Sequence, residues 1–383
     1  VDLLMLNQPR LLNTYFDNEL EGLRAARAEL SKFTNRIEVA PIDSEASKFS
    51  RLKLAAVSAI ASTSYTANWL KGKQVVSTYV GMLKDCEYDL IHFDTISLDF
   101  LRAHTPADIP LALDHHNIES HMMLRRSEKE PKLSKKLYFS IEHKKLFNEE
   151  QSAVPHYSTN IVCSNEDAKH LKVMSPASTV EVIPNGIRLS ASKPSRNIET
   201  GKLLFIGGLS WYPNEAAIRD FIKHVAPLLR QNGTEFHLDI IGKNPPADLE
   251  EQVRDHGDIQ FHGFVDDIQI FYERANAYIC PINDGGGTKL KVLDALAHSV
   301  PLVGYPLACE GIEVTNGKNV LLAESHKQFC DHITMLIENH SYAHEIGHAG
   351  RALIETGYSF ERIGQKIAAH YNDIVHNTDS QTV

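Results

Sequence analysis

The sequence predicts an α/β protein made of two doubly wound, Rossmann-like domains. Short apolar segments alternate with helix-like segments along nearly the whole chain, and a polar junction rich in turn-forming residues separates the halves near residues 184–197. Alternation of strand and helix indicates parallel sheets that are covered by helices on both faces. The 383 residues exceed the size of one ordinary core, so two domains are expected.

The strands are predicted from short apolar, β-branched runs that turn residues bound on both sides, and the helices from apolar residues at helical spacing. The domains are expected at 1–187 and 188–360, followed by a helix and polar tail at 361–383 that can pack back on the first domain. Ligands of such sheets bind beyond the carboxyl ends of the strands, so the site is expected in a cleft between the domains. Strands are predicted at 3–6, 37–40, 89–93, 110–114, 160–163, 180–183, 202–206, 237–241, 259–262, 277–280, 301–304 and 319–321, and helices include 12–33, 133–150, 215–230, 289–297 and 326–338.

Composition and charge exclude several classes of protein. The chain is 43% hydrophobic and 23% charged, and no apolar run approaches the length of about 20 residues that a membrane-spanning helix needs. A net charge of −10 argues against nucleic-acid binding. The five scattered cysteines form no CxxC pair, which suits reduced thiols in a cytoplasmic protein. His115, His116 and His121 lack the partners of a metal site, so no metal is expected.

The segment at residues 284–297 carries the strongest functional signal. It places glycines before an apolar-periodic helix, with Lys289 in the first helical turn and Asp294 further along. Glycine N–H groups, the positive end of a helix and a lysine together attract a phosphate, and a carboxylate can accept hydrogen bonds from ligand hydroxyls. The alternative is a glycine loop that only caps a core helix. The loop residues are Gly285, Gly286, Gly287 and Thr288.

Several segments together resemble the donor-binding domain of the retaining glycosyltransferases with the GT-B fold that form family 4, often called glycosyl transferases group 1. The similarity covers about residues 160–375 and is strongest to a bacterial subgroup with a GGGT-(Arg/Lys)-LK segment. It implies two Rossmann-like domains facing across a cleft, with the donor sugar nucleotide on the second. The segments are an "IPNG" junction at 183–186, a loop at Gly207 and Gly208 followed by Asn214, an "F-x-G-x-V" loop at 261–265 that includes Phe264 and Val265, and the glycine helix at 284–297.

The first half contains one further matching segment. Residues 114–119 resemble the "DxHNxE" segment of some bacterial members, in which a strand delivers a histidine to the cleft. The resemblance implies that His116 is a catalytic residue, with Asp114, Asn117 and Glu119 as its neighbours. A histidine there can donate to a sugar hydroxyl or to a developing charge. The alternative is a histidine that is satisfied inside a loop.

The chain departs from the family pattern at the donor site. The first carboxylate of the family's E-x7-E pattern falls on Gly286, whereas Asp294 fits the second. The basic pair that usually grips the donor phosphates falls on Gly208 and Asn214, which are both neutral. Lys289 is therefore the expected phosphate ligand and, with His116, the expected catalytic residue. Lys291 is the second available lysine.

A further departure concerns the start of the chain. The family's first strand ends in a glycine-rich loop, but the only glycine among the first 70 residues here is Gly22, inside a helical pattern. Two expectations follow: either the first βα unit of the domain precedes Val1, with which the lack of an initiating Met agrees, or the domain is truncated.

The implied reaction is retaining transfer of a sugar from a UDP- or GDP-type donor to a hydroxyl of a glycan, a lipid-linked or a small-molecule acceptor, with no metal and no tightly bound cofactor. The rivals are a degenerate, non-catalytic GT-B binding or assembly partner, and another GT-B enzyme such as a sugar-nucleotide epimerase. A cytoplasmic protein is expected. The basic segment from Arg125 to Lys145, with eight Lys/Arg and three Glu, can contact the inner face of a membrane, or it can be a solvated helix face.

Overall fold

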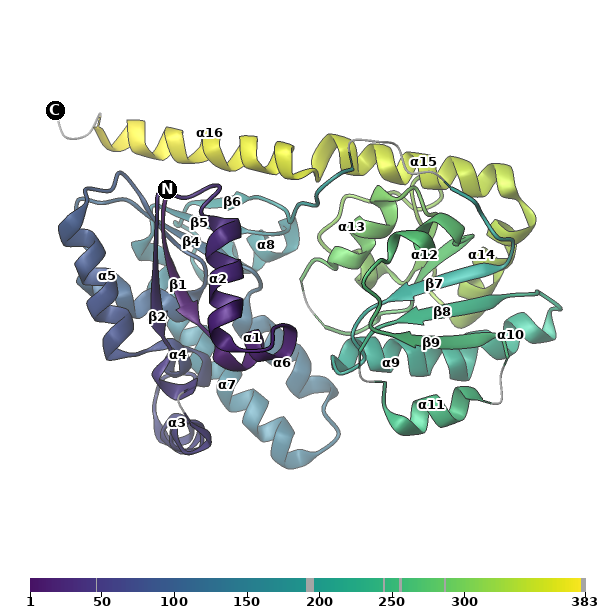
Figure 1. The fold of residues 1–383 in the computed structure, drawn as a ribbon, viewed down its shortest axis with the longest axis horizontal. Helices are drawn as coiled ribbons and strands as arrows, with labels where there is room; N and C mark the ends of the chain where they lie inside the picture. The colour runs from purple at the N-terminus through teal and green to yellow at the C-terminus, as the bar shows by residue number, and fades with distance from the viewer. Residues whose placement is uncertain (46, 191–195, 244, 255–256, 286, 380–383) are drawn as a thin grey trace. The chain divides into compact units, whose positions relative to one another are not determined.

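The computed structural model describes residues 1–383 except 46, 191–195, 244, 255–256, 286 and 380–383. The chain forms two compact units, each with helices around parallel sheet (Figure 1). This is the α/β architecture that strand–helix alternation predicts. Unit 1 comprises Val1–Val162, Asp167–Glu181 and Tyr371–Val383, and unit 2 comprises Cys163–Glu166 and Val182–His370.

Unit 1 contains two parallel sheets. Strand β1 (Asp2–Asn7) pairs with β2 (Arg36–Pro41), with Leu3 opposite Ile37. A four-stranded sheet has the order β3-β4-β5-β6, so β1 does not stand at its centre. Its strands are β3 (Ile91–Phe93), β4 (Leu111–His115), β5 (Thr159–Val162) and β6 (Val180–Val182).

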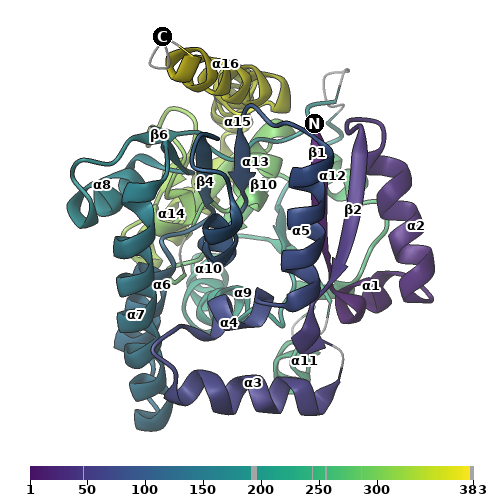
Figure 2. The same cartoon turned by 90° about the vertical axis from the view of Figure 1, so that its left-hand side faces the viewer.

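Helix α5 packs on β1 and β2, and α7 packs along α6 (Figure 2). The core that they cover includes Val75, Phe93 and Leu113, which are almost fully buried. The helices are α1 (Pro9–Tyr15), α2 (Glu19–Leu30), η1 (Asp43–Glu45), α3 (Lys48–Ile60), α4 (Tyr65–Leu70), α5 (Lys73–Asp85), η2 (Ile96–His104), α6 (Glu119–Lys129), α7 (Leu133–Ala153), η3 (Val154–His156), α8 (Asn165–Met174) and the end of α16 (Phe360–Asp379).

The single helix predicted at residues 12–33 is wrong, because the structure has two. Helix α1 ends at Tyr15, Phe16 is extended, and α2 begins at Glu19. The side chain of Asn18 accepts a hydrogen bond from the backbone N–H of Glu21 at 3.0 Å. An asparagine at this position satisfies one of the free N–H groups of a helix start, so the chain begins a new helix there.

Unit 2 is built on one six-stranded sheet with the order β12-β11-β10-β7-β8-β9. Along β7 the side chains alternate between two cores: Leu203 and Phe205 enter one, and Leu204 enters the other. Both faces of the sheet are therefore covered. The strands are β7 (Lys202–Ile206), β8 (His237–Ile241), β9 (Ile259–Gly263), β10 (Ala277–Cys280), β11 (Leu302–Gly304) and β12 (Leu321–Leu322).

The helix predicted at residues 215–230 contains a π-helical stretch, Phe221–Val225, between α9 and α10. Pro227 follows this stretch in the first turn of α10. Proline lacks the N–H that an uninterrupted α-helix would use, which accounts for the irregular turn before it. The helices of unit 2 are α9 (Tyr212–Asp220), α10 (Ala226–Gln231), α11 (Ala247–Arg254), α12 (Gln269–Arg274), α13 (Leu290–Ala297), η5 (Pro306–Cys309), α14 (His326–Glu338), α15 (His340–Gly357) and most of α16.

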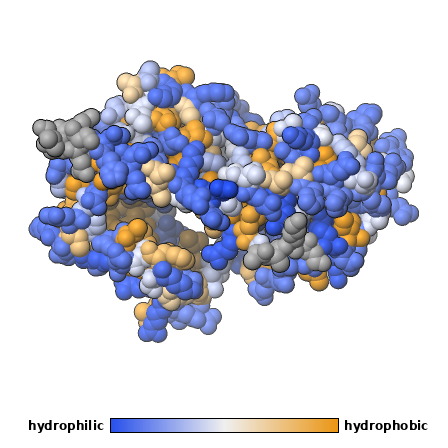
Figure 3. Space-filling model, turned by 90° about the horizontal axis from the view of Figure 1, so that it is seen from above, coloured by the Kyte–Doolittle hydropathy of each residue, from blue (hydrophilic) through white to orange (hydrophobic). Residues whose placement is uncertain are grey.

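Hydrophilic side chains predominate on the face shown in Figure 3, with apolar ones scattered among them. Among the described residues, no helix has the length and hydropathy needed to cross a lipid bilayer.

Candidate functional site

The sheet of unit 2 has its topological switch point between β7 and β10. From β7 the chain continues outward to β8 and β9, and it then returns to the other side of β7 as β10. Ligands of open parallel sheets bind beyond the carboxyl ends of the strands at such a point. Gly207 directly follows β7, and Gly285 follows shortly after the end of β10. The two glycine segments that the sequence singles out therefore leave the sheet from adjacent strands.

A side chain at Gly207 would have to displace Lys291 or Asn214. A Cβ atom at this position would lie 2.4 Å from Nζ of Lys291 and 2.8 Å from Nδ2 of Asn214. The buried hydroxyl of Tyr278 on β10 accepts a hydrogen bond from the N–H of Ile206 at 3.1 Å, which ties the end of β7 to its neighbour. Gly208 is exposed and has open space around it. The backbone at the end of β7 is thus held on one side and accessible on the other.

Lys291 reaches this loop from the first turn of α13. Its Nζ donates a hydrogen bond to Oδ1 of Asn214 at 2.6 Å and lies 4.6 Å from the ring centroid of Phe205. Nδ2 of Asn214 donates in turn to the carbonyl of Gly208 at 2.8 Å. Burial lowers the pKa of Lys291 to about 8, although Cys280 nearby raises it. The structure therefore places a lysine amine beside one of the two neutral positions where relatives have a basic pair.

Lys289 precedes the helix. The expectation that it lies in the first helical turn is wrong, because α13 begins at Leu290 and Lys289 is its N-cap in an extended conformation. Its side chain is 9% exposed, and Nζ donates to the carbonyl of Gly287 at 2.8 Å. Gly285 and Gly287 have φ angles of +91° and +68°, which residues with a Cβ rarely adopt. Gly286 lies outside the described residues.

The carboxylate of Glu310, which lies in a segment that matches the family but had no role assigned from the sequence, is near Lys289. Oε2 of Glu310 is 3.9 Å from Nζ of Lys289. The next residue, Gly311, has a φ of +82°, and a Cβ there would lie 2.6 Å from Oγ1 of Thr288. Among the described residues, that buried hydroxyl oxygen has no hydrogen-bond partner. Thr288 is thus a buried polar group that a ligand could satisfy.

Asp294 lies one turn into α13 and is partly buried. Burial raises the pKa of its carboxyl, and His298 acts in the opposite direction. Nδ1 of His298 donates to the backbone carbonyl of Asp294 at 2.8 Å, and its ring stacks on that of Tyr272 with centroids 4.2 Å apart. Sequence reasoning did not identify His298 or Tyr272 as neighbours of Asp294. The one signal in the sequence is that a histidine lies one helical turn after Asp294.

The loop after β9 holds the two positions expected to read the base. Phe264 is 61% exposed, and Nζ of Lys243 lies 4.3 Å from its ring centroid. Val265 instead packs against the core of unit 2. The two neighbours therefore face different surroundings, and Phe264 alone offers an open aromatic surface.

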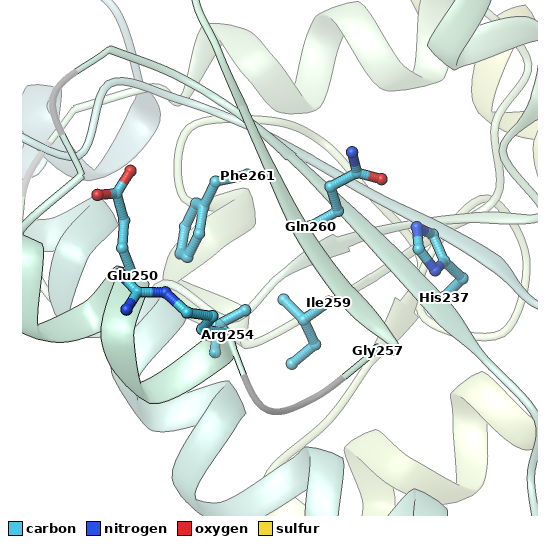
Figure 4. Close-up of a pocket in the computed structure, with 8 residues that line it drawn as sticks. His237, Glu250, Arg254, Gly257, Ile259, Gln260 and Phe261 are labelled. Atoms are coloured by element: carbon cyan, nitrogen blue, oxygen red, sulfur yellow. The ribbon is translucent and has the colours of Figure 1, made fainter.

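Unit 2 also has a hollow of about 480 Å³ at a different place (Figure 4). Its lining includes His237 and Ile259, the first residues of β8 and β9, and Glu250 and Arg254 of α11. It therefore lies at the amino ends of these strands. Since ligands of such sheets bind at the carboxyl ends, we do not assign the donor site to this hollow.

In unit 1, His116 follows β4 and Asp94 follows the neighbouring strand β3. Nε2 of His116 is 3.4 Å from Oδ1 of Asp94, and Nε2 of His92 is 3.8 Å from the same oxygen. Nδ1 of His92 forms a 2.5 Å hydrogen bond with the hydroxyl of Tyr371 on α16. Hydrogen bonding to Asp94 raises the pKa of His116, and burial opposes it.

The adjacent histidines differ in environment. His115 is 2% exposed, and its Nε2 pairs with Oδ1 of Asn160 at 3.2 Å. Burial lowers the pKa of His115 to about 4, so it stays neutral. The side chain of His116 is 54% exposed and is favoured in its charged form. The geometry thus suits a structural His115 and a His116 that is available to a ligand.

Burial also raises the pKa values of Asp114 and Glu119, the expected neighbours of His116. His92, Asp94 and Asp114 each offer a possible metal-ligand atom, and these atoms lie within 4.8 Å of one another. His121 instead packs against His170, and the centroids of the two rings are 3.9 Å apart. The group that could hold a metal ion therefore contains His92 and none of the three histidines considered from the sequence, His115, His116 and His121.

Comparison with known proteins agrees with this geometry. A family model described as "Glycosyl transferases group 1" matches residues 200–339, which include both glycine segments. An "Uncharacterized 44.6 kDa protein in cps region" of Klebsiella pneumoniae is 23% identical over 173 residues, which are 43% of this chain and 44% of that protein. The chain thus matches less than half the length of that curated relative.

Solved glycosyltransferases share the fold at low sequence identity. HepE of Anabaena, in complex with UDP and glucose, is 16% identical with a TM-score of 0.60, covering 91% of this chain and 89% of HepE. Sucrose-phosphate synthase of Thermosynechococcus elongatus is 16% identical with a TM-score of 0.60 and 79% coverage of both chains. The pneumococcal O-GlcNAc transferase GtfA, in complex with UDP and GlcNAc, is 14% identical with a TM-score of 0.56, covering 79% of this chain and 60% of GtfA.

The protein therefore has the GT-B glycosyltransferase fold. Within this fold, residues 200–339 match the family model of the glycosyl transferases group 1.

Proposed function

We propose that the protein transfers a sugar from a nucleoside-diphosphate donor to an acceptor hydroxyl. One observation carries the proposal: the glycine segments after β7 and β10 meet at the switch point of unit 2, where Lys291 and Asn214 join them through a 2.6 Å hydrogen bond. The matched family segment includes all of these residues. HepE and GtfA were solved with UDP, so UDP-sugars are the first donors to test.

The donor diphosphate would lie over Gly207, Gly208 and the start of α13. The helix N-terminus carries partial positive charge, and Lys289 and Lys291 add amines on either side. The hydroxyl of Thr288, which has no hydrogen-bond partner among the described residues, can donate to a phosphate oxygen or to a sugar hydroxyl. Further along α13, Asp294 would accept hydrogen bonds from the ribose, and the open face of Phe264 would contact the base.

The proposed chemistry is transfer with retention at the anomeric carbon. The bond from that carbon to the donor phosphate breaks, the acceptor oxygen bonds on the same face, and the acceptor proton passes to the departing phosphate. This route needs charge stabilisation on the leaving group, which Lys289, Lys291 and the glycine loop would supply. His116 of unit 1 would donate a hydrogen bond to the transferred sugar.

The direct test is a screen of UDP- and GDP-sugars for hydrolysis and for transfer to glycan, lipid-linked and small-molecule acceptors. Loss of one charge-stabilising donor typically costs about 3–4 kcal/mol of barrier. Lys289→Ala is therefore expected to lower turnover about a hundredfold or more. A decrease below about threefold would remove Lys289 from the catalytic group.

Nucleotide titration tests the binding role separately. Asp294→Asn is expected to weaken UDP or GDP binding while leaving the fold intact, because it removes a hydrogen-bond acceptor for the ribose. An unchanged dissociation constant would exclude that role. If the unaltered protein binds neither nucleotide, the non-catalytic partner becomes the better assignment.

A further inference from the structure

Helix α7 exposes apolar side chains in its first half, and its buried residues include two glutamates beside Phe139 and Leu146. Leu133, Leu137 and Ile141 repeat every four residues and are 83%, 62% and 42% exposed. Glu142 and Glu150, in contrast, are 4% and 0% exposed. At 3.6 residues per turn, these two sets occupy opposite sides of the helix. The apolar stripe therefore faces water in its first half.

Hydrogen bonds to the rest of unit 1 fix this rotation. A side-chain oxygen of Glu142 accepts a hydrogen bond from the backbone N–H of Tyr65 at 2.8 Å. Glu150 accepts from the backbone N–H of Ser120 at 3.2 Å and from the hydroxyl of the same serine. Turning α7 to bury its leucines would leave these polar groups unpaired, at a free-energy cost for each. The exposed stripe is thus a consequence of how α7 is anchored.

Helix α3 exposes a second apolar stripe. Phe49, Leu52 and Ile60 are 75%, 69% and 88% exposed, and their spacing puts them on one side of the helix. Only Ser58 of this helix is buried. Nζ of Lys145 on α7 donates to the carbonyl of Ser58 at 2.6 Å, and Figures 1 and 2 both show α3 next to the lower part of α7. The two stripes belong to neighbouring helices.

Basic residues lie in the same segments of the chain as both apolar stripes. Helix α3 contains Lys48, Arg51 and Lys53 and no acidic residue, and the segment 125–145 has eight Lys/Arg and three Glu. Together these segments carry +8, so the remainder of a chain with net charge −10 carries −18. These two segments therefore carry a local positive excess on an acidic chain, although they hold only 11 of its 39 Lys/Arg residues.

We propose that this α3–α7 surface, formed by Phe49, Leu52, Ile60, Leu133, Leu137, Ile141 and the neighbouring lysines, docks on an anionic lipid membrane. Aliphatic and aromatic side chains enter the boundary between headgroups and acyl chains, while lysines bind the anionic headgroups. Exposed apolar stripes indicate an interaction site, and the positive charge beside them favours an anionic partner. Docking does not require sugar transfer. If the proposed function holds, docking would bring the protein to lipid-linked acceptors.

The test is co-sedimentation of the full chain with vesicles of phosphatidylcholine, with and without phosphatidylglycerol. We expect binding to the anionic vesicles that weakens with added salt, and little binding to phosphatidylcholine alone. The double variant Leu52→Glu/Leu137→Glu should bind at least about tenfold more weakly, because it places carboxylates in both stripes. Val173→Glu is the matched control, since Val173 is 84% exposed but lies on α8.

Absence of binding to anionic vesicles by the unaltered chain would overturn the proposal, as would equal binding by the double variant and the control. Sedimentation velocity addresses a second copy as the occupant: self-association that the double variant abolishes, without vesicle binding, would assign the surface to a dimer instead. Nucleotide titration of the double variant separates this proposal from the proposed function. Unaltered nucleotide binding together with lost vesicle binding would support membrane docking alone.

Discussion

The amine of Lys291 lies in buried surroundings that disfavour its protonated, charged form. Burial lowers its pKa to about 8, and its one hydrogen-bond acceptor given by the structure is the neutral amide of Asn214. A buried amine with a neutral partner gains much more from an anion than an exposed lysine does. The sequence favours Lys289 because it lies nearer the helix start. In the structure Lys289 bonds to the carbonyl of Gly287, whereas Lys291 lies beside Gly207 and Asn214 at the loop after β7.

This difference predicts proton uptake when nucleotide binds. Above pH 8 the amine of the free protein loses its proton, and a bound diphosphate favours the protonated form, so affinity should fall as the pH rises through about 8. Calorimetry of UDP or GDP binding in buffers of different ionisation enthalpy measures the uptake. Lys291→Met should abolish it and weaken binding about tenfold or more.

Exposed Lys318 provides the matched control, and Lys318→Met should bind nucleotide as the unaltered protein does. Equal proton uptake by Lys291→Met and Lys318→Met would show that another group titrates.

Asp94 should set the charge of His116. The carboxylate raises the pKa of His116, so Asp94→Asn should move that pKa downward. Because the pKa is raised in the folded state, the pair stabilises the fold below the ordinary histidine pKa, and this contribution is lost as the pH rises through the raised value. NMR titration of the His116 ring measures the shift. Asp108→Asn, at an exposed position, should leave the titration curve in place.

Among the elements, the loop after β7 is defined by contacts that sequence alone does not reveal. The glycine doublet predicted a phosphate loop, but it did not show that the two glycines have different roles. At Gly207 a Cβ would overlap Nζ of Lys291, whereas at Gly208 a Cβ would lie 4.0 Å from Oγ of Ser210. Gly207 therefore allows close packing in this loop, whereas Gly208 leaves the backbone accessible to a ligand.

Gly207→Ala should displace Lys291 or the loop and weaken nucleotide binding at least about tenfold. Gly208→Ala is the matched change at an open position and should leave the folded structure and its thermal stability unchanged. Thermal unfolding and nucleotide titration of both variants check this expectation. If Gly207→Ala bound nucleotide as tightly as Gly208→Ala, the contact of Gly207 with Lys291 would not shape the site.

At the scale of the whole molecule, the buried strands were the most predictable elements. Residues 202–206, 237–241 and 277–280 were predicted with the observed bounds, because each is a continuous apolar run between turn residues. Helix interruptions were harder to predict, since they depend on a single cap such as Asn18 and on the turn before Pro227. Asp94 was missed, and the approach of Glu310 to Lys289 was not predicted, because the partners lie far apart in sequence.

The whole protein is expected to work without a divalent metal. Lysine amines and the start of α13 would provide the positive charge that a metal would otherwise bring to a diphosphate. Transfer activity should therefore persist in excess EDTA. Loss of activity that Mn²⁺ or Mg²⁺ restores would contradict this, and His92, Asp94 and Asp114 would then be the first ligands to substitute.

The pairing of β7 with β10 also has a consequence for the order of folding. Gly207 and Gly285 lie far apart in the chain, and β8 and β9 are made between them. Such a non-local pairing closes a long loop and forms slowly compared with a local helix. The nucleotide site needs both strands, so nucleotide binding should appear late during refolding. Bound nucleotide should also slow the unfolding of unit 2.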